Sequence, residues 1–257
     1  MTISQLDRAA RGRLRTVSKE TAEVVGKHLV MAGRLIDTDP ELAYEHAQAA
    51  VRRAGRVDVV REAAGLTAYR TGRYAEALRE LRTVRRLNGS SEHLPIMADC
   101  ERGLGRPERA LALAASEEAG TLDDVARTEL AIVVSGARVD LDELDAALAV
   151  LDHVPAVGTR GELGARVLQA KAAVLELLGR TEEAAELLGS VDAAALGSAL
   201  DEDDDVVVYD LTEDGDDLGA ESGDAVAATQ HATGPGDEEG PVGSAAPGDR
   251  PTTEESR

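Results

Sequence analysis

The chain has 257 residues, of which 28 are Lys or Arg and 49 are Asp or Glu, so its formal net charge at pH 7 is −21. Apolar residues make up 43% of the chain, but aromatic residues only 2%, with four Tyr and neither Phe nor Trp. A core without large rings must be filled by Ala, Leu and Val, which favours closely packed helices and argues against an all-β fold. The single cysteine excludes an internal disulfide and a zinc site built from several cysteines.

Residues 1–19 are predicted to form a basic arm that precedes the first helix. Five bases stand against one acid, Asp7, for a net charge of +4: Arg8, Arg11, Arg13, Arg15 and Lys19. The arm lacks the apolar stretch of a signal peptide, and no run approaches the roughly 18 apolar residues of a membrane span. We therefore expect a cytoplasmic protein that does not enter a membrane.

Residues 20–196 are predicted to form a series of helical hairpins. The clearest unit spans residues 61–87, where one helix ends at Gly72 and a second begins near Tyr74. An alanine recurs in each second helix at spacings of 34, 33, 37 and 37 residues: Ala43, Ala77, Ala110, Ala147 and Ala184. Two helices that cross near contact distance leave room for only Gly or Ala, so this recurrence predicts stacked crossings. The alternative is a helical bundle in which the spacing is coincidental.

The period and the residue types resemble the tetratricopeptide repeat family, whose unit is a helix-turn-helix of 34 residues. Gly65, Gly72, Tyr74, Ala77 and Leu81 stand where that family has its first-helix Gly, turn Gly, turn Tyr, second-helix Ala and large apolar residue. The chain departs from the family in the longer fourth and fifth units and in Arg61, which replaces the family's Trp. Residues 26–113 are also similar to uncharacterised actinobacterial repeat proteins. The resemblance implies an all-α, right-handed α-solenoid of about five hairpins.

The resemblance also implies that the first helix of each unit lines a concave groove for a peptide or protein partner. The residues expected to face this groove carry both charges: His28, Glu62, Leu66, Tyr69, Arg70, Asp99, Arg102, Arg166 and Gln169. The Lys and Asn that form a carboxylate clamp in chaperone-binding relatives are missing. The leading hypothesis is a non-enzymatic protein-interaction scaffold.

Arginines gather on two of the predicted second helices and form a basic ridge. Three end one helix and three share a face of the next: Arg52, Arg53 and Arg56, then Arg79, Arg82 and Arg86. Cations near a helix C-terminus meet a favourable dipole, which accounts for part of this pattern. The alternative function is therefore a nucleic-acid- or ribosome-associated protein, whose binding without aromatic stacking would depend on phosphate contacts and fall with salt.

Residues 197–257 are predicted to form a disordered acidic tail, because acids, Gly and Pro dominate and no helical periodicity follows Leu218. Residues 201–257 hold 18 acids and two bases, a net charge of −16. One hypothesis is that Asp201–Asp217 folds back on the basic ridge and inhibits it. Within this segment, residues 206–211 are interpreted as a short strand that docks on a partner or in the groove. A purely solubilising role is the other interpretation.

Catalytic and metal-binding chemistry is sparse in this chain. Its five His residues are scattered, with no two at the four-residue spacing that would pair them on one helix face: His28, His46, His93, His153 and His231. Cys100 lies among apolar residues and is predicted to be a buried small side chain. We expect no enzymatic activity, no cofactor and no metal.

Overall fold

The computed structural model describes residues 2–154 and 161–189. All the described residues belong to one compact unit of the chain. The predicted acidic tail, including Asp201–Asp217 and residues 206–211, therefore lies outside the described residues.

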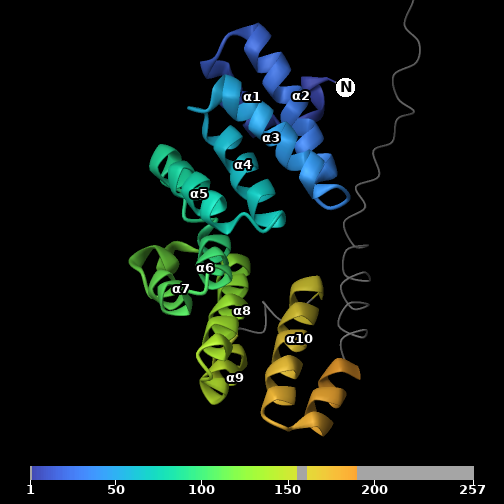
Figure 1. The fold of residues 1–257 in the computed structure, drawn as a ribbon, viewed down its shortest axis with the longest axis vertical. Coiled ribbons are helices and arrows are strands. Elements are labelled where there is room, and N and C mark those ends of the chain that lie inside the picture. Colours follow the sequence, from blue (N-terminus) through green and yellow to red (C-terminus); the bar gives the residue numbers. More distant parts are fainter. Residues whose placement is uncertain (1, 155–160, 190–257) are drawn as a thin grey trace, which may run out of the picture. The chain divides into compact units, whose positions relative to one another are not determined.

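The described part of the chain is helical and contains no strand, which confirms the all-α prediction for these residues. Ten helices carry labels in Figure 1: α1 (Arg8–Arg13), α2 (Lys19–Leu35), α3 (Pro40–Ala54), α4 (Asp58–Arg70), α5 (Tyr74–Asn88), α6 (Leu94–Gly103), α7 (Pro107–Ala114), α8 (Asp124–Asp140), α9 (Leu144–Asp152) and α10 (Gly161–Leu177). Residues 181–189 are helical as well. Three short 3₁₀ helices complete the order: η1 (Ile3–Gln5), η2 (Leu14–Thr16) and η3 (Glu117–Thr121).

Consecutive helices pack in pairs. Within the pairs, α2 packs on α3, α4 on α5, α6 on α7 and α8 on α9. Between successive pairs, α3 contacts α4, α5 contacts α6, and α7 contacts α8. We call α2, α4, α6, α8 and α10 the first helices, and α3, α5, α7, α9 and residues 181–189 the second helices. Among the first helices, α2 contacts α4, α6 contacts α8, and α8 contacts α10.

Side-chain caps and prolines define where several helices begin. The side chains of Ser18, Asp39 and Asp123 accept hydrogen bonds from backbone N–H groups in the first turns of α2, α3 and α8. Pro40 and Pro107 open α3 and α7, at positions where the missing N–H would have no helical partner. These local signals fix where the four helices begin.

The turn from first to second helix has the same backbone form in four of the pairs. In each, a residue with positive φ follows the first helix, and the next residue donates its N–H to a carbonyl five positions back: Arg73 to Ala68, Arg106 to Glu101, Glu143 to Arg138 and Arg180 to Leu175. This is the Schellman motif, which satisfies carbonyls that the helix end leaves free. The residue with positive φ is Gly72, Gly105 or Gly179 in three turns and Asp142, at φ 63°, in the fourth.

Substitution Asp142→Gly is expected to raise the free energy of unfolding by about 1 kcal/mol, because positive φ costs residues with a Cβ more than it costs glycine. The reciprocal substitution Gly105→Asp, at φ 70°, is expected to lower it by a similar amount. Urea unfolding followed by far-UV circular dichroism measures both. A loss of stability in Asp142→Gly would contradict this account of the turns.

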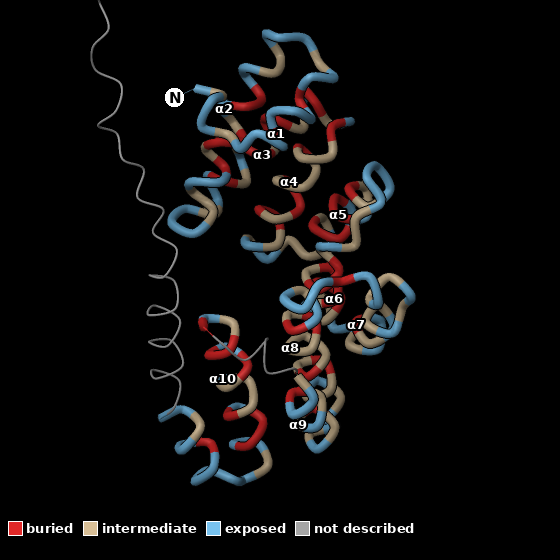
Figure 2. The backbone as a smooth tube through the Cα atoms, turned by 180° about the vertical axis from the view of Figure 1, so that it is seen from behind, coloured by how far each residue is buried: buried red, intermediate tan, exposed pale blue. Residues whose placement is uncertain are grey.

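The recurring alanines are buried in equivalent places. Each is the fourth residue of its second helix, and none is more than 1% exposed: Ala43, Ala77, Ala110, Ala147 and Ala184. At Gly65, on α4, an added Cβ would lie 2.6 Å from Cδ2 of Leu81 on α5. Figure 2 shows the buried positions, in red, recurring along the sides of α4, α6, α8 and α10. Small residues thus allow neighbouring helices to approach closely, as the spacing predicts.

The prediction that residues 1–19 form an arm before the first helix is wrong, because residues 8–13 form α1. Leu14 is only 1% exposed and belongs to a cluster with Val25 and Val60. Leu6, Ala10 and Leu14 recur every four residues and give this segment an apolar side, which the charge count overlooks. The arginines of the segment stay exposed.

Across residues 2–154 and 161–189, no helix combines the length and the apolar character that crossing a membrane requires.

Candidate functional site

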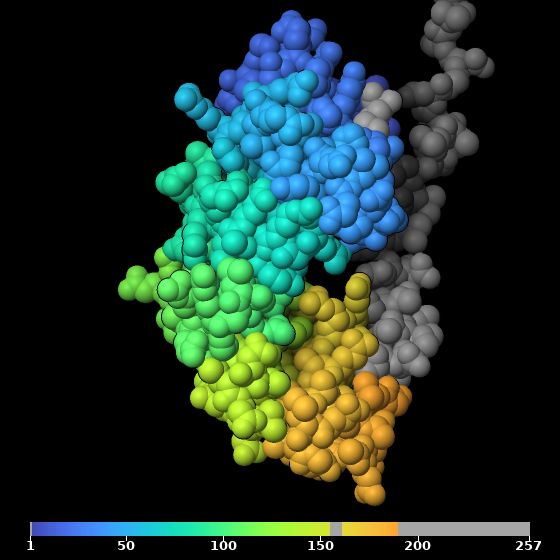
Figure 3. Space-filling view, in the orientation of Figure 1, coloured from blue at the N-terminus to red at the C-terminus, as the bar shows by residue number. Residues whose placement is uncertain are grey.

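The first helices line a cavity of about 820 Å³, to which α4, α6, α8 and α10 all contribute. Figure 3 shows the surface hollowed beside α10, which is drawn in gold. The apolar part of the lining consists mainly of branched aliphatic side chains, together with Pro95: Ile36, Leu66, Ile96, Val125, Ile132 and Val133. Val125 is 61% exposed, so this lining is open to an incoming ligand.

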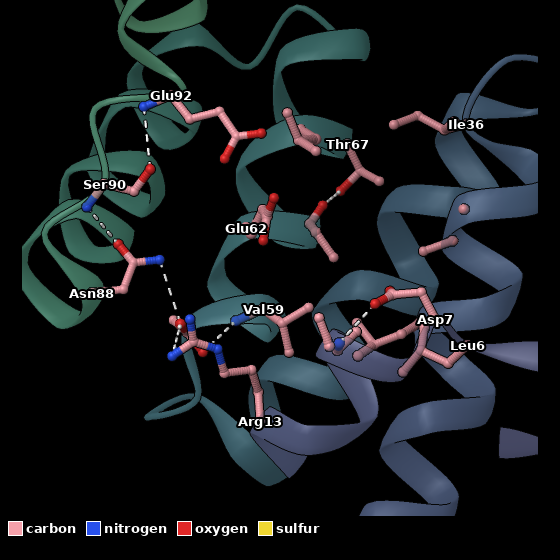
Figure 4. A pocket seen from close by; sticks show the side chains of 18 residues that line it. Leu6, Asp7, Arg13, Ile36, Val59, Glu62, Thr67, Asn88, Ser90 and Glu92 are labelled. Carbon is pink, nitrogen blue, oxygen red and sulfur yellow. Dashed lines mark hydrogen bonds and ion pairs between the residues drawn. The ribbon is translucent and has the colours of Figure 1, made fainter. Parts of the chain in front are cut away.

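A second cavity of about 610 Å³ adjoins the first and shares Ile36, Leu66 and Glu92 with it. It is lined by α1, α2, α4 and the segment between α5 and α6. Figure 4 shows Glu62 on α4 between Glu92 on one side and Asp7 and Leu6 on the other. We call the two adjoining cavities together the groove.

The groove brings together most of the residues predicted to face it. Six of them line the larger cavity: Leu66, Tyr69, Arg70, Asp99, Arg102 and Arg166. Glu62 lines the smaller one and lies 3.1 Å from Nε2 of His93, just before α6. Gln169 is exposed on α10 and lines neither cavity.

The prediction that His28 faces the groove is wrong. His28 points toward α3, where its Nδ1 lies 2.9 Å from Nδ1 of His46. The two residues line a different cavity, together with Tyr44 and Arg52. The reason is helix phase: on α2, the side toward the groove carries Leu29, Ala32 and Gly33.

The pair of imidazoles predicts a pH dependence of stability. The pKa of His28 is lowered by burial first, and then by His46, Arg53 and Arg52. A base whose folded pKa lies below its unfolded value of 6.5 contributes stability above that value, and this stability is lost as the pH falls through the folded pKa.

Substitution His28→Gln is therefore expected to reduce the loss of folding stability between neutral and mildly acidic pH. Urea unfolding on either side of pH 6.5 measures the difference. His153→Gln is the matched control, because it removes an exposed histidine at the C-terminal end of α9 whose ring contacts the carbonyl of Ala149 and neither His28 nor His46. An unchanged dependence in His28→Gln would contradict this assignment.

Each arginine that lines the groove is paired with a carboxylate. In the larger cavity, Arg102 bonds to Asp99 at 2.8 Å and to Asp140 at 2.7 Å, Arg70 pairs with Asp37, and Arg166 pairs with Glu129. These bonds join α6 to the end of α8, α4 to the turn after α2, and α10 to α8. In the smaller cavity, Arg13 lies 3.3 Å from Asp58. The positive charges of the lining are thus matched within the protein.

Tyr69 and Asp99 form a hydrogen bond in the larger cavity. The hydroxyl of Tyr69 donates to Oδ2 of Asp99 at 2.6 Å, which joins α4 to α6. Burial, together with this bond and the charge of Asp99, raises the pKa of Tyr69 well above its usual value. Tyr69 is therefore a neutral hydrogen-bond donor that positions Asp99.

Three exposed carboxylates at the edge of the larger cavity have no basic partner among residues 2–154 and 161–189: Glu92, Asp123 and Glu162. Asp123 caps α8 through the N–H of Ala126. In total, five carboxylates and three arginines line this cavity, so its net charge is −2 when His93 is neutral. The groove therefore offers uncompensated negative charge around an apolar lining.

Sequence reasoning missed the three free carboxylates and, apart from Leu66, the apolar lining. The sequence does contain a signal for the lining. Val125 and Ile132 lie seven residues apart, which places them on the same face of one helix, and neither belongs to the series of recurring alanines. Asp123 and Glu162 stand at the starts of helices, where acidic residues commonly cap the helix or interact with its dipole. Their presence in the sequence therefore does not by itself indicate a binding site.

The basic ridge is partly neutralised. Arg82 bonds to Glu101 at 2.7 Å, and Arg79 lies 3.4 Å from Glu80. Arg53 donates to the backbone carbonyl of Ala49. Four ridge arginines are exposed and pair with no acid in the described part of the chain: Arg52, Arg53, Arg56 and Arg86.

Within the described residues, no three His, Cys, Asp or Glu side chains are grouped so that they could hold a metal ion. Cys100 is fully buried, which confirms its prediction as a small core residue. Burial, with smaller contributions from Asp99 and Glu101, raises its pKa to about 12. The sulfur is therefore a protonated thiol at neutral pH.

Comparison with protein-family models, with curated proteins and with solved structures finds no match to this chain.

Proposed function

We propose that the described residues form a right-handed α-solenoid of tetratricopeptide-type hairpins that acts as a non-enzymatic protein-interaction scaffold. Support for the repeat comes from the five alanines buried at the fourth position of successive second helices. The four identical helix-ending turns add to it. A stack of such hairpins presents an extended surface to its ligands.

One observation carries the functional proposal. The first helices of successive pairs line adjoining cavities of about 820 and 610 Å³, with an apolar lining and charged edges. Apolar surface with a few placed polar groups is typical of binding sites, and an elongated groove accommodates a peptide segment better than a small compact molecule. The partner is therefore a protein or peptide.

The alternative, nucleic-acid or ribosome binding through the basic ridge, has weaker support. Two of the six ridge arginines are already paired with acids, Arg79 with Glu80 and Arg82 with Glu101. Phosphate-driven binding would depend on the four ridge arginines that pair with no acid in the described part of the chain, since each neutralised phosphate adds to the affinity. Inhibition of the ridge by the acidic tail stays a hypothesis.

Selection from a displayed random-peptide library on the full chain tests groove binding. Peptides selected on the parent chain should bind Val125→Gln about tenfold more weakly, because an apolar contact in the larger cavity is lost. Leu87→Gln is the matched control: Leu87 is also an exposed apolar residue, at 46%, but it lies on α5 outside both cavities. Failure to select any peptide, or equal weakening by both substitutions, would contradict the proposal.

A further inference from the structure

We propose that the groove selects protein segments in which Lys or Arg side chains alternate with apolar side chains. This inference rests on the proposed groove function and specifies the chemistry of the partner. It follows from the charges that the fold leaves uncompensated at the groove.

In the larger cavity all the arginines are paired with carboxylates, whereas some of the carboxylates have no basic partner among the described residues. Arg70, Arg102 and Arg166 each bond to a carboxylate of a neighbouring element, so an acidic ligand would have to compete with that carboxylate for the guanidinium. The free charges at the same edge are all negative. They belong to Glu92, Asp123 and Glu162.

The three free carboxylates come from three different elements. Glu92 precedes α6, Asp123 precedes α8, and Glu162 lies in the first turn of α10. They therefore lie along the succession of first helices instead of on one helix. A cationic partner can reach more than one of them while its apolar side chains contact Ile96, Val125 or Ile132.

The acidic tail of this chain is a poor occupant of the groove. Residues 201–257 hold 18 acids and two bases, so the groove carboxylates would repel most of the segment. Charge complementarity instead favours a separate basic partner. Attraction between exposed charges is screened by salt, so the affinity for such a partner should fall as the salt concentration rises.

Fluorescence anisotropy with three short labelled peptides on the full chain tests this inference. The peptides alternate Leu with Lys, Leu with Ser or Leu with Glu. We expect the Leu/Lys peptide to bind most tightly. The triple substitution Glu92→Gln/Asp123→Asn/Glu162→Gln should weaken it about tenfold, with little change for the Leu/Ser peptide.

The matched control removes three exposed acids from first helical turns outside the groove: Glu20→Gln/Glu108→Gln/Asp145→Asn. Both triple variants keep the acidic tail and lose the same charge, so attraction to the tail affects them equally. Thermal unfolding by circular dichroism checks that both are folded. Equal weakening by the two triple variants would overturn the inference.

The remaining outcomes separate this inference from the groove function. If the Leu/Ser peptide binds as tightly as the Leu/Lys peptide and Val125→Gln weakens both, the groove binds peptides but does not select cations, and the inference fails alone. If none of the three peptides binds and library selection also fails, the groove function is contradicted as well.

Discussion

Replacement of Ala77 by Leu is expected to lower the free energy of unfolding by about 3 kcal/mol, because three extra carbon atoms must enter a filled helix crossing. Ala77 is fully buried in a cluster with Ala68, Leu81 and Cys100. Urea unfolding monitored by far-UV circular dichroism measures the change. If the recurring alanines occupy equivalent crossings, Ala110→Leu and Ala147→Leu should show losses of similar size.

The control for this prediction is Ala75→Leu, on the same helix at an exposed position. It adds the same atoms to a side of α5 that faces solvent, so its effect should be small. If Ala75→Leu and Ala77→Leu destabilise the chain equally, the small side chain at the crossing is not what the fold requires.

Removal of the guanidinium of Arg82 has the second-largest expected effect. Glu101 on α6 is only 2% exposed, and its Oε1 accepts a hydrogen bond from Arg82 at 2.7 Å. Its Oε2 lies 3.6 Å from Arg106 and forms no hydrogen bond. We expect Arg82→Met to lower the free energy of unfolding by about 2 kcal/mol, because a buried carboxylate loses its closest partner. This expected loss of stability is smaller than the loss expected for a fully buried ion pair, because the side chain of Arg82 is 55% exposed.

A double-mutant cycle separates the ion pair from other effects of the arginine side chain. Arg82→Met/Glu101→Met should regain most of the lost stability, because it leaves no buried charge without a partner. Arg86→Met, an exposed arginine on the same helix, is the control and should have little effect. If the double variant is no more stable than Arg82→Met, Glu101 does not depend on this pair.

The features of the fold that could be predicted from the sequence are those imposed by local sterics. The alanine spacing locates close crossings, because only small side chains fit there, and glycines at 72, 105 and 179 locate turns that need positive φ. Asp142, which occupies the fourth such turn, gives a weaker signal because aspartate is also common at helix starts. The helix at residues 8–13 was missed because its small apolar side is interrupted by arginines.

The candidate site was less predictable because it depends on contacts between distant residues. The residues near Arg82 in the sequence do not reveal its partner, because Glu101 is 19 residues away on another helix. The groove arginines are paired across similar or larger separations, as Arg102 is with Asp140. Spacing alone therefore identified polar groove residues but not which of them keep an uncompensated charge. The orientation of His28 likewise depends on how α2 is rotated against α3, which residue spacing leaves open.

Isoleucine methyl resonances test the central claim most directly. The chain has four isoleucines. Ile36, Ile96 and Ile132 line the groove, and Ile3 packs against Gly26 outside it. In a titration of the methyl-labelled full chain with the Leu/Lys peptide, we predict saturable shifts of the three groove resonances and none of Ile3. Shifts of Ile3 alone, or no shift at peptide concentrations that saturate the anisotropy signal, would contradict a groove formed by the first helices.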